Sequence, residues 1–582
     1  MFKKEKRQGT LQYLMRSDIT DRMEDDHRVR KYIIPKRILW KTNQEEAYVV
    51  NEKCLLEKRS GQITLNTGNA CRMNNNGAQA SLLIDFGMEL HGGIEILSWN
   101  GGDGKRTRLR VRFGESAMEA MSELGENNST NDHAIRDQET EVSFMGMSEV
   151  GNTGFRFVRI DLLDENSYVE LKSIRAIFTY KDVKYKGSFR SNDELINQIW
   201  ETGAYTVHLN MQNYLWDGIK RDRLVWIGDM HPETSTIQRV FGYDASVPKS
   251  LDLIRDETSL PGWMNAIPSY SMWWIIIHKD WYLQNGDFKY LKEQKDYLLS
   301  LLSYLKEYIF KDGTNTIPNP FIDWPSTGNK AAVDAGVHSL LILAMSAGSE
   351  LCKELGEIDA SETYAGVVET LRKHIPDHGN NKQAAALMVL SGLVDETEIN
   401  RDILSVGGAK RISSFLGYYV LQARARAGDI KGSLDCIRDY WGGMLSLGAT
   451  TFWEDFNIEW LENAAPIDEF PVGDQIDVHG TYGDHCYVKY RHSLCHGWAS
   501  GPTAWLSEYV LGIKVLEAGC LTIEVKPQLG DLKWAEGSYP TPFGEVFVSH
   551  KLKKDESIQS YIQAPKKVNI ICSTNAVVEV TN

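Results

Sequence analysis

The hydrophobic period of the sequence changes twice along the chain, and this feature constrains the fold more than any other. From about residue 46 to 185, short runs of alternating apolar residues such as ASLLIDFG and RLRVRFGES are separated by glycine and asparagine. From 193 to about 512 apolar residues recur at helical spacing, and alternation returns from Leu521. A period of two indicates β-strands and a period near 3.6 indicates amphipathic helices. We therefore predict a multidomain protein with a helical domain between two β-domains.

The predicted helices come in consecutive pairs, about ten to twelve in number, joined by loops of very unequal length. A solenoid would show a regular period, so we predict a closed toroid of helical hairpins, an (α/α)6 fold, with its long loops (214–232, 311–330 and 450–492) at one end. The expected units are an N-terminal arm lying on a later domain (1–40), a jelly-roll-like β-sandwich (41–187), the (α/α)6 catalytic domain (188–515) and a small C-terminal β-sandwich (516–582).

Composition narrows the classes of partner. The formal net charge of −15 argues against a nucleic-acid partner. The eight cysteines show no CxxC or Cys/His ligand spacing, so we expect no zinc site. We also expect no membrane span, because no 18-residue apolar run occurs. The basic start lacks an apolar signal region, so a cytoplasmic location is the simplest expectation, although a chain trimmed at its N-terminus would give the same pattern. The oligomeric state is not indicated.

The stretch WDGIKRDRLVWIGDMHPE, residues 216–233, mixes carboxylates, basic side chains and two tryptophans. A solvated surface network is the commoner meaning of such a charge run. Here, however, Trp216 and Trp226 alternate with the charges, as in sites where a sugar ring stacks on an indole while carboxylates bind its hydroxyls. Gly218 and Gly228 indicate a loop rather than a helix. We predict that this loop contributes to a binding site.

Three further clusters place carboxylates or histidine beside indoles. Each alone is more often packing, but four clusters at corresponding ends of helical hairpins favour one shared site. Glycoside hydrolysis needs two carboxyl groups on different loops, one protonated to assist the leaving oxygen and one ionised to activate water or attack carbon. The clusters contain Asp323 and Trp324, then Trp453, Glu454 and Asp455, then His496 and Trp498.

These motifs resemble those of the inverting α-L-rhamnosidases of the six-hairpin glycosidase class, whose signature runs Asp-Cys-Pro-x-Arg-(Asp)-Glu-Arg-x-Gly-Trp-x-Gly-Asp. In DGIKRDRLVWIGD, six signature residues stay in register: Asp217, Arg221, Arg223, Trp226, Gly228 and Asp229. Further similar segments are DFG at 85–87 with Gly92, TFWEDF at 451–456, SLCHGWASGP at 493–502 and VKPQLGDLKWAEGSYPTPFG at 525–544. The resemblance covers nearly the whole chain after residue 40.

The resemblance implies that Glu454 is the general base and that a sugar subsite is lined by Asp217, Arg221, Trp226, Asp229, Trp324 and His496. We add Asp323, Trp453 and Trp498 to the expected substrate-binding residues. Two departures occur: Gly218-Ile219 replaces Cys-Pro, and Asp222 stands for the general-acid glutamate, one methylene shorter. If Asp222 is the acid, Arg221 and Arg223 should point towards Asp217 and Asp229; otherwise Asp229 or Glu233 is next in line.

The predicted function is removal of a terminal α-L-rhamnosyl or related deoxy sugar from a glycoside or oligosaccharide, with inversion. Acid, base and water suffice for this reaction, so no metal or organic cofactor is implied. Two alternatives stay open: a catalytically altered homologue that binds carbohydrate, and a lyase or other exo-glycosidase on the same toroid. Retention of Glu454, Asp229 and Arg221 favours an enzyme. Release of reducing sugar without a rise in ultraviolet absorbance would distinguish hydrolysis from elimination.

Overall fold

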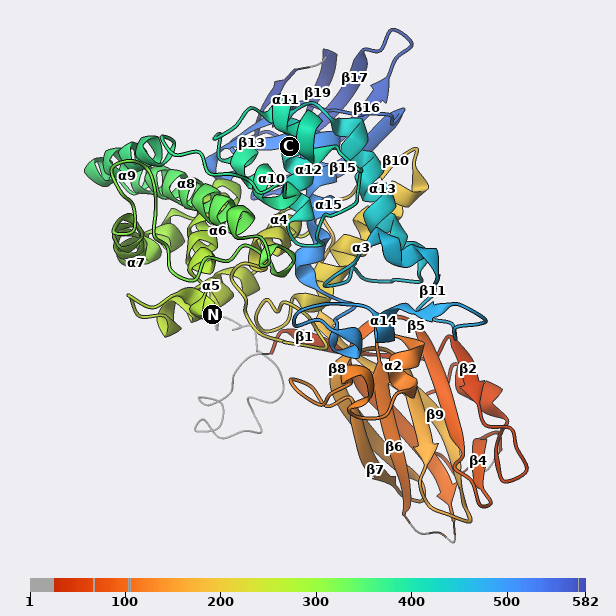
Figure 1. Cartoon of the computed structure of the whole chain (residues 1–582). Coiled ribbons are helices and arrows are strands. Elements are labelled where there is room, and N and C mark those ends of the chain that lie inside the picture. Colours follow the sequence, from red (N-terminus) through yellow and green to blue (C-terminus); the bar gives the residue numbers. More distant parts are fainter. Residues whose placement is uncertain (1–25, 66–67, 103, 105, 574, 582) are drawn as a thin grey trace, which may run out of the picture.

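The computed structural model describes residues 26–582 apart from 66–67, 103, 105, 574 and 582 (Figure 1). Its N-terminal part is one nine-stranded sheet with the order β3-β4-β9-β5-β8-β6-β7, to which β1 adds on β9 and β2 on β5. All pairs in this sheet are antiparallel. The strands are β1(Arg28–Ile33), β2(Arg37–Lys41), β3(Ala47–Val50), β4(Cys71–Asn75), β5(Ser81–Gly101), β6(Thr107–Gly114), β7(Asp137–Val142), β8(Gly146–Leu162) and β9(Ser167–Lys181).

The expectation of uniformly short strands was wrong, because β5, β8 and β9 contain 21, 17 and 15 residues. Glycines that look like breaks in the sequence lie inside these strands. Gly92, with φ +141°, sits at an irregularity where the register of β5 against β8 shifts. A side chain at Gly92 would collide with the Ile177 carbonyl of β9, so only glycine allows this close pairing. The bulge bends the strand without ending it.

One face of the sheet encloses a single apolar core. Residues from seven of the nine strands contribute to it, for example Val49, Met73, Ile84, Val111 and Ile160. The opposite face is covered in part by the short helix α2(Ala117–Met121), against which Leu83 and Phe157 pack. The alternation of apolar residues in the sequence therefore reflects a sheet whose two faces meet different neighbours.

The predicted N-terminal arm was wrong for the part that the structure describes. Residues 28–41 form β1 and β2, which are strands of the nine-stranded sheet and not a separate arm. The pairing Arg28↔Lys181 to Ile33↔Ala176 explains why: β9 offers a free edge along its whole second half. Residues 1–25 lie outside the described part of the chain.

The central region is a ring of helices. Six of them, α4, α6, α8, α10, α12 and α15, contact one another in that order, and α15 returns to contact α4, which closes the toroid. The remaining main helices lie outside this ring, as α7 on α6 and α9 on α8. The bounds are α3(Glu194–Asn210), α4(Met230–Val240), α5(Ser246–Glu257), α6(Pro268–Asn285), α7(Phe288–Lys306), α8(Lys330–Glu354), α9(Ile358–Leu371), α10(Lys382–Leu390), α11(Glu396–Ile399), α12(Gly417–Arg426), α13(Ile430–Ser446), α14(Val478–Thr481) and α15(Gly501–Trp505).

The inner and outer positions follow from the amino-acid pattern of each helix. The inner helix α6 buries side chains all around its axis, including Trp273, Trp274 and Trp281, whereas the outer helix α7 buries one stripe that includes Leu298 and Leu302. Helix α8 is long and apolar enough to cross a membrane by length and composition alone, and most of it is buried in the toroid. Residues 193–310, all of which are described, contain no strand, as predicted.

The C-terminal region holds a five-stranded sheet, β10-β15-β16-β17-β19, and a three-stranded sheet, β13-β14-β18. The short β10(Arg190–Ser191) comes from the segment just before α3 and pairs with β15, so this sheet begins before the helical domain. Apolar residues of both sheets, such as Ile523 of β14 and Val548 of β16, belong to the same core cluster as the toroid. The other strands are β13(Ile513–Glu517), β14(Thr522–Val525), β15(Trp534–Thr541), β16(Gly544–Leu552), β17(Ile558–Pro565), β18(Asn569–Cys572) and β19(Asn575–Thr581).

Candidate active site

Four loops meet at the end of the toroid where the inner helices begin. The loop before α4 contacts the loop before α15 through an isolated bridge between Gly218 and His496 and through the Gly497 N–H, which donates to the Asp217 carbonyl (2.8 Å). The Glu454 N–H donates to the Ser493 carbonyl (2.9 Å). These backbone bonds bring three of the predicted clusters together. In the fourth cluster, Asp323 accepts a hydrogen bond from the Ser413 hydroxyl (3.0 Å), and Ser413 lies just before α12.

Arg221 lies between the two predicted catalytic carboxylates. Its Nη2 donates to Oε1 (2.9 Å) and Oε2 (2.8 Å) of Glu454, and its Nη1 donates to Oδ1 of Asp222 (3.0 Å). Burial alone would lower the pKa of Arg221, but the charges of Glu454 and Asp222 outweigh it and raise the pKa. Because both carboxylates bind one guanidinium, they are no more than about 8 Å apart, compared with roughly 6.5–9.5 Å in inverting glycosidases.

Glu454 and Asp222 differ in their surroundings. Glu454 is buried and also accepts the Ser493 N–H (3.1 Å), while its own carbonyl accepts the indole N–H of Trp498 (2.9 Å). The side chain of Asp222 is 19% exposed, and its Oδ1 lies 3.3 Å from Nε2 of His133. Of the two carboxylates, only Asp222 therefore combines a surface opening with a position next to Arg221.

Asp217 shapes the loop instead of facing a ligand. Its Oδ2 accepts the Asp222 N–H (2.9 Å) and its Oδ1 accepts the Leu224 N–H (3.0 Å), so both oxygens hold backbone. Burial raises the pKa of Asp217 to about 7, and the nearby Asp229 adds to this shift. The sequence argument placed Asp217 in the sugar subsite, whereas its contacts show that it fixes the conformation of the loop that carries Arg221 and Asp222.

His496 and Asp229 form a buried pair, with His496 Nε2 3.1 Å from Asp229 Oδ2. Burial alone would lower the pKa of His496, but the charges of Glu454 and Asp229 outweigh it and raise the pKa to about 9. Burial also raises the pKa of Asp229, although His496 and the Tyr270 hydroxyl (3.2 Å) oppose the shift. Because both pKa values are raised, the pair of His496 and Asp229 retains its protons to higher pH than the free side chains would. We therefore treat His496 as imidazolium at neutral pH.

The predicted aromatic residues divide into two groups. Trp226 is half-buried and Trp324 is exposed, beside His485 at a ring distance of 5.9 Å, so both offer surface to a ligand. Trp453 and Trp498 are buried, and Trp498 stacks on Phe415 at 5.0 Å. Trp453 directly precedes Glu454, and Trp498 donates to the Glu454 carbonyl, so both tryptophans hold Glu454 in place. Asp323 is likewise buried and caps the turn η5(Trp324–Ser326), where it accepts the Ser326 N–H (3.1 Å).

The structure does not meet the geometric condition that the sequence analysis set for Asp222 as general acid. Arg221 points to Asp222 and Glu454, not to Asp217 or Asp229. Arg223 donates to the Asn152 carbonyl (2.9 Å) and lies over the Trp216 ring at 4.8 Å. Neither fallback candidate is more accessible: Asp229 is bound to His496, and Glu233 is fully buried, with burial raising its pKa well above the usual range.

Some contributing residues were not found from the sequence. His133 reaches Asp222 from the polar segment 121–138 of the N-terminal domain, in which the sequence analysis named no site residue. Lys220 lies in the charge run of residues 216–233 but points away from the site: its Nζ is 3.0 Å from Glu115, 3.2 Å from Glu119 and 2.7 Å from the His492 carbonyl. The only sign in the sequence of the contact between His133 and Asp222 is a histidine within a polar segment.

Glu115 and Glu119 also lie with His479 at a spacing that could hold a metal ion. The ammonium of Lys220 already supplies the positive charge between the two carboxylates. Burial alone would lower the pKa of Lys220, but Glu115 and Glu119 outweigh it and raise the pKa. The cluster is therefore a polar contact between the N-terminal domain and the candidate active-site loop.

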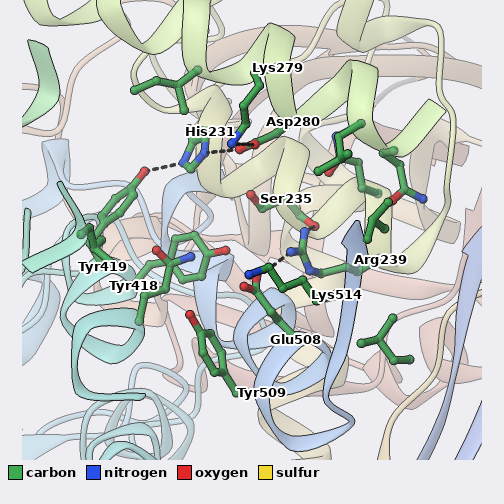
Figure 2. Close-up of a pocket in the computed structure, with 18 of the residues that line it drawn as sticks. His231, Ser235, Arg239, Lys279, Asp280, Tyr418, Tyr419, Glu508, Tyr509 and Lys514 are labelled. Atoms are coloured by element: carbon green, nitrogen blue, oxygen red, sulfur yellow. Dashed lines mark hydrogen bonds and ion pairs between the residues drawn. The ribbon is translucent and has the colours of Figure 1, made fainter. Parts of the chain in front are cut away.

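A cavity inside the ring does not coincide with this chemistry. It measures about 480 Å³ and is lined by residues of α4, α6 and α12, with His231, Arg239 and Asp280 in its wall (Figure 2). None of the predicted catalytic or substrate-binding residues lines it. A second cavity of about 420 Å³ includes His133 and Arg223 and therefore adjoins Asp222. We assign the reaction to the loop end, because the carboxylate pair lies there.

The comparisons with known proteins identify relatives of this chain. The family described as the bacterial α-L-rhamnosidase six-hairpin glycosidase domain matches residues 184–400. An α-L-rhamnosidase of Alteromonas sp. (strain LOR) is 25% identical over 481 residues, which cover 73% of this chain and 49% of that protein. An α-L-rhamnosidase of Formosa agariphila is 22% identical over 466 residues, which cover 71% and 46%. The chain spans about half the length of these curated relatives.

Two solved structures have the same fold. A rhamnosidase of family GH78 from Bacillus sp. GL1 has a TM-score of 0.72 at 22% identity, covering 91% of this chain and 56% of that chain. A rhamnosidase from Klebsiella oxytoca with rhamnose bound has a TM-score of 0.62 at 17% identity, covering 83% and 96%. Likeness at this level of identity shows the architecture, a helical toroid combined with β-sheets.

Proposed function

Because the chain belongs to the α-L-rhamnosidase family of six-hairpin glycosidases, we propose that it hydrolyses glycosides or oligosaccharides, removing a terminal α-L-rhamnosyl or related deoxy sugar with inversion. The observation that carries this proposal is the placement of Asp222 and Glu454 on the two amino groups of Arg221. The two carboxyl groups are no more than about 8 Å apart, an upper limit that lies within the range of inverting pairs. Trp226 and Trp324 offer the surfaces on which the ring would rest.

Glu454 is the general base in this proposal. Arg221 and the Ser493 N–H donate three hydrogen bonds to its carboxylate, which fix the positions of both oxygens. Trp453 and Trp498 are buried next to it. A base held in this way is positioned before substrate binds.

Asp222 is the general acid in this proposal. We prefer Asp222 to Asp229 and Glu233 because Asp222 is partly exposed, whereas Asp229 is bound to His496 and Glu233 is fully buried. The partial exposure of Asp222 and its position beside the 420 Å³ cavity place it where an aglycone could leave.

The flanking β-regions complete the architecture. We infer that the nine-stranded sheet folds over as a jelly-roll-like sandwich, because one of its faces supplies a single enclosed core. The two C-terminal sheets would form a second, smaller sandwich. The N-terminal unit also contributes to the site, since His133 contacts Asp222.

The test is a screen of aryl glycosides of L-rhamnose, L-fucose, D-galactose and D-glucuronate with the purified chain. We expect release of phenol from the α-L-rhamnoside, and proton NMR should show the β-anomer of the free sugar first. Release of an unsaturated product with ultraviolet absorbance would indicate a lyase. Binding of L-rhamnose without turnover of any glycoside would indicate a catalytically altered homologue and would contradict the proposal.

A further inference from the structure

The 480 Å³ cavity lies inside the ring of inner helices. It is lined by residues along α4, α6 and α12, from His231 and Tyr418 in first turns to Arg239 and Arg426 in last turns, and by the π-helical turn η10(Leu506–Val510) and the strands β13 and β14 of the C-terminal region. Figure 2 shows His231 and Arg239 in its wall. Asp229 precedes α4 on the catalytic side, whereas Arg239 lies in the last turn of the same helix in the cavity. The cavity thus runs along α4 from His231, two residues after Asp229, to Arg239, and none of the predicted catalytic or substrate-binding residues lines it.

Polar groups of the wall are held in place by mutual contacts. Arg239 Nη2 lies 2.8 Å from Oε2 of Glu508. Asp280 bridges two neighbours, with His231 Nε2 3.1 Å from Oδ2 and Lys279 Nζ 3.0 Å from Oδ1. His231 in turn is 2.7 Å from the Tyr419 hydroxyl. Such groups are ordered before any ligand enters, which lowers the entropy that binding must overcome.

Hydroxyl, amide and aromatic side chains complete the wall. Tyr418, Tyr509 and Tyr539 line the cavity together with Gln238 and Gln422, and Trp273 closes one side. Tyrosine hydroxyls and glutamine amides both donate and accept hydrogen bonds, so they suit a ligand with several hydroxyl groups. A volume of about 480 Å³ lies at the lower end of the range of small-molecule sites, roughly 300–1,000 Å³. A monosaccharide-sized ligand fits this space.

The charge of the wall differs from that of the whole chain. The chain has a formal charge of −15, yet the cavity is lined by five basic side chains and three carboxylates. Arg239 and Arg426 lie in the last turns of α4 and α12, where they also offset the negative helix ends. Lys514 and Lys526 lie on or beside strands, so the helix dipoles do not explain them.

The two lysines are supplied by the C-terminal region. Lys514 lies on β13, and Lys526 directly follows β14, its antiparallel partner. Although Lys514 is opposite Glu524 in the register, neither lysine forms an ion pair with any residue in the described part of the chain. Both are exposed at the cavity and so remain available to an anion.

We propose that this cavity is a second ligand site, which binds a polyhydroxylated anion of monosaccharide size, either a sugar acid or a sugar phosphate. The hydroxyl groups of the ligand would bond to the tyrosines and glutamines inside, while its anionic group would meet Lys514 and Lys526. This site is independent of the proposed hydrolysis, because it shares no residue with the carboxylate pair.

Isothermal titration calorimetry of the full chain tests the proposal. The probes are D-glucuronate and D-glucose 6-phosphate, with D-glucose and inorganic phosphate as controls for the sugar and for the anion alone. We expect at least one anionic sugar to bind more tightly than both controls. The double variant Lys514→Gln/Lys526→Gln should weaken that binding by about tenfold. Lys553→Gln, an exposed lysine on the same C-terminal region outside the cavity, should not.

The outcomes separate the ligand sources and can overturn the site. Tighter binding of glucuronate identifies a sugar acid, and tighter binding of glucose 6-phosphate identifies a sugar phosphate. Equal binding of D-glucose or of inorganic phosphate would contradict recognition of both features, and no binding of either anionic sugar would refute the site. Displacement by excess L-rhamnose, or unchanged affinity in the double lysine variant, would place the anion elsewhere and also overturn the proposal.

Discussion

Arg221 donates hydrogen bonds to both proposed catalytic carboxylates, so replacing either one also changes the electrostatic environment of the other. A mutation here therefore has two consequences, the loss of a proton-transfer group and the release of a buried guanidinium. Amide replacements keep the shape and remove the charge, which makes them the most informative changes. Their effects should be read on at least two substrates, because proton donation and binding respond differently to the leaving group.

We predict that Glu454→Gln lowers kcat by ~10²–10⁴ with little change in KM, because a positioned proton transfer contributes about that factor. Initial rates on an aryl α-L-rhamnoside measure the effect. Glu459→Gln is the matched control, since Glu459 is exposed on the same loop and pairs only with Lys410 at the surface. A loss confined to KM would contradict the role of general base.

Asp222→Asn should be much less harmful on an aryl glycoside than on a natural disaccharide, because an activated phenol leaves without protonation. The ratio of kcat/KM for the two substrates, compared between wild type and variant, measures this. Asp229→Asn is the comparison, since Asp229 anchors His496 and its loss should affect both substrates alike. Equal losses for Asp222→Asn on both substrates would assign Asp222 to binding, and a selective loss for Asp229→Asn would assign the acid to Asp229.

His496 should make stability depend on pH. Its pKa is raised to about 9 in the folded protein, against about 6.5 in an unfolded chain. A histidine with a raised pKa stabilises the fold fully below the unfolded value, and this contribution is lost as pH rises through the folded value. We expect the Tm difference between wild type and His496→Gln to shrink between pH 6.5 and 9.5. The corresponding change in the free energy of unfolding is roughly 3 kcal/mol.

Thermal unfolding at pH 6.5, 8 and 9.5 measures this difference. His485→Gln is the control, because His485 is exposed and its Tm difference from wild type should stay constant with pH. A constant difference for His496→Gln as well would show that His496 is neutral in the folded protein. That result would also remove the cation from the proposed sugar subsite.

At the scale of elements, the loop before α4 is held by the N-terminal domain. Lys220 connects it to Glu115 and Glu119 beside α2 and to the carbonyls of Tyr490 and His492. Burial raises the pKa of Glu115 to about 7, and Lys220 opposes this shift, so removing the ammonium leaves buried carboxyl groups without a counter-charge. Lys220 directly precedes Arg221 in the sequence, so its loss would affect the loop that carries the proposed catalytic residues.

We predict that Lys220→Met destabilises the protein by about 3–5 kcal/mol, the cost of breaking a buried ion pair by removing one partner. Adding Glu119→Gln in the Lys220→Met background should recover part of this loss, because it removes an unpaired buried charge. Chemical denaturation midpoints measure both effects. Lys410→Met, at an exposed ion pair with Glu459, should change stability by less than about 1 kcal/mol. No recovery in the double variant would contradict the electrostatic explanation.

For the whole molecule, the distribution of apolar cores predicts which parts unfold together. The helical toroid and the C-terminal sheets share one core, whereas the N-terminal sheet has its own. Tyr539 of β15 also donates to Gln284 of α6 (2.5 Å), and Gln284 returns a bond to the Pro540 carbonyl (2.9 Å). The toroid should therefore depend on the C-terminal sheets for its stability.

We predict that Val548→Asp, a buried position in β16, lowers the Tm of the transition reported by tryptophan fluorescence and near-ultraviolet circular dichroism of the toroid. Burying an unpaired charge should cost more than about 3 kcal/mol. Val577→Asp is the control, because Val577 is 60% exposed on β19 and its change should stay within about 0.5 kcal/mol. An unchanged toroid transition in Val548→Asp would show that the C-terminal sheets unfold independently.

Much of the architecture followed from the period of the sequence. The change from alternating to helical spacing predicted the helical region, and the pattern of α6 against α7 shows why inner and outer helices differ. The grouping of Asp217, Arg221, Asp229, Glu454 and His496 also followed from motifs, since each lies in or at the end of a loop between helices that combines charged and aromatic residues. The N-terminal strands were misjudged, because a glycine in a bulge and a glycine that ends a strand look alike in sequence.

By itself the sequence determined which residue types are available for acid, base and stacking chemistry and in which loops they lie. Only the tertiary structure decided their partners: Arg221 between Glu454 and Asp222, Asp217 on backbone N–H groups, His133 beside Asp222, and Lys220 turned to another domain. The physical reason is that periodicity reports burial along one segment, whereas a hydrogen bond or ion pair depends on distances between segments far apart in the chain.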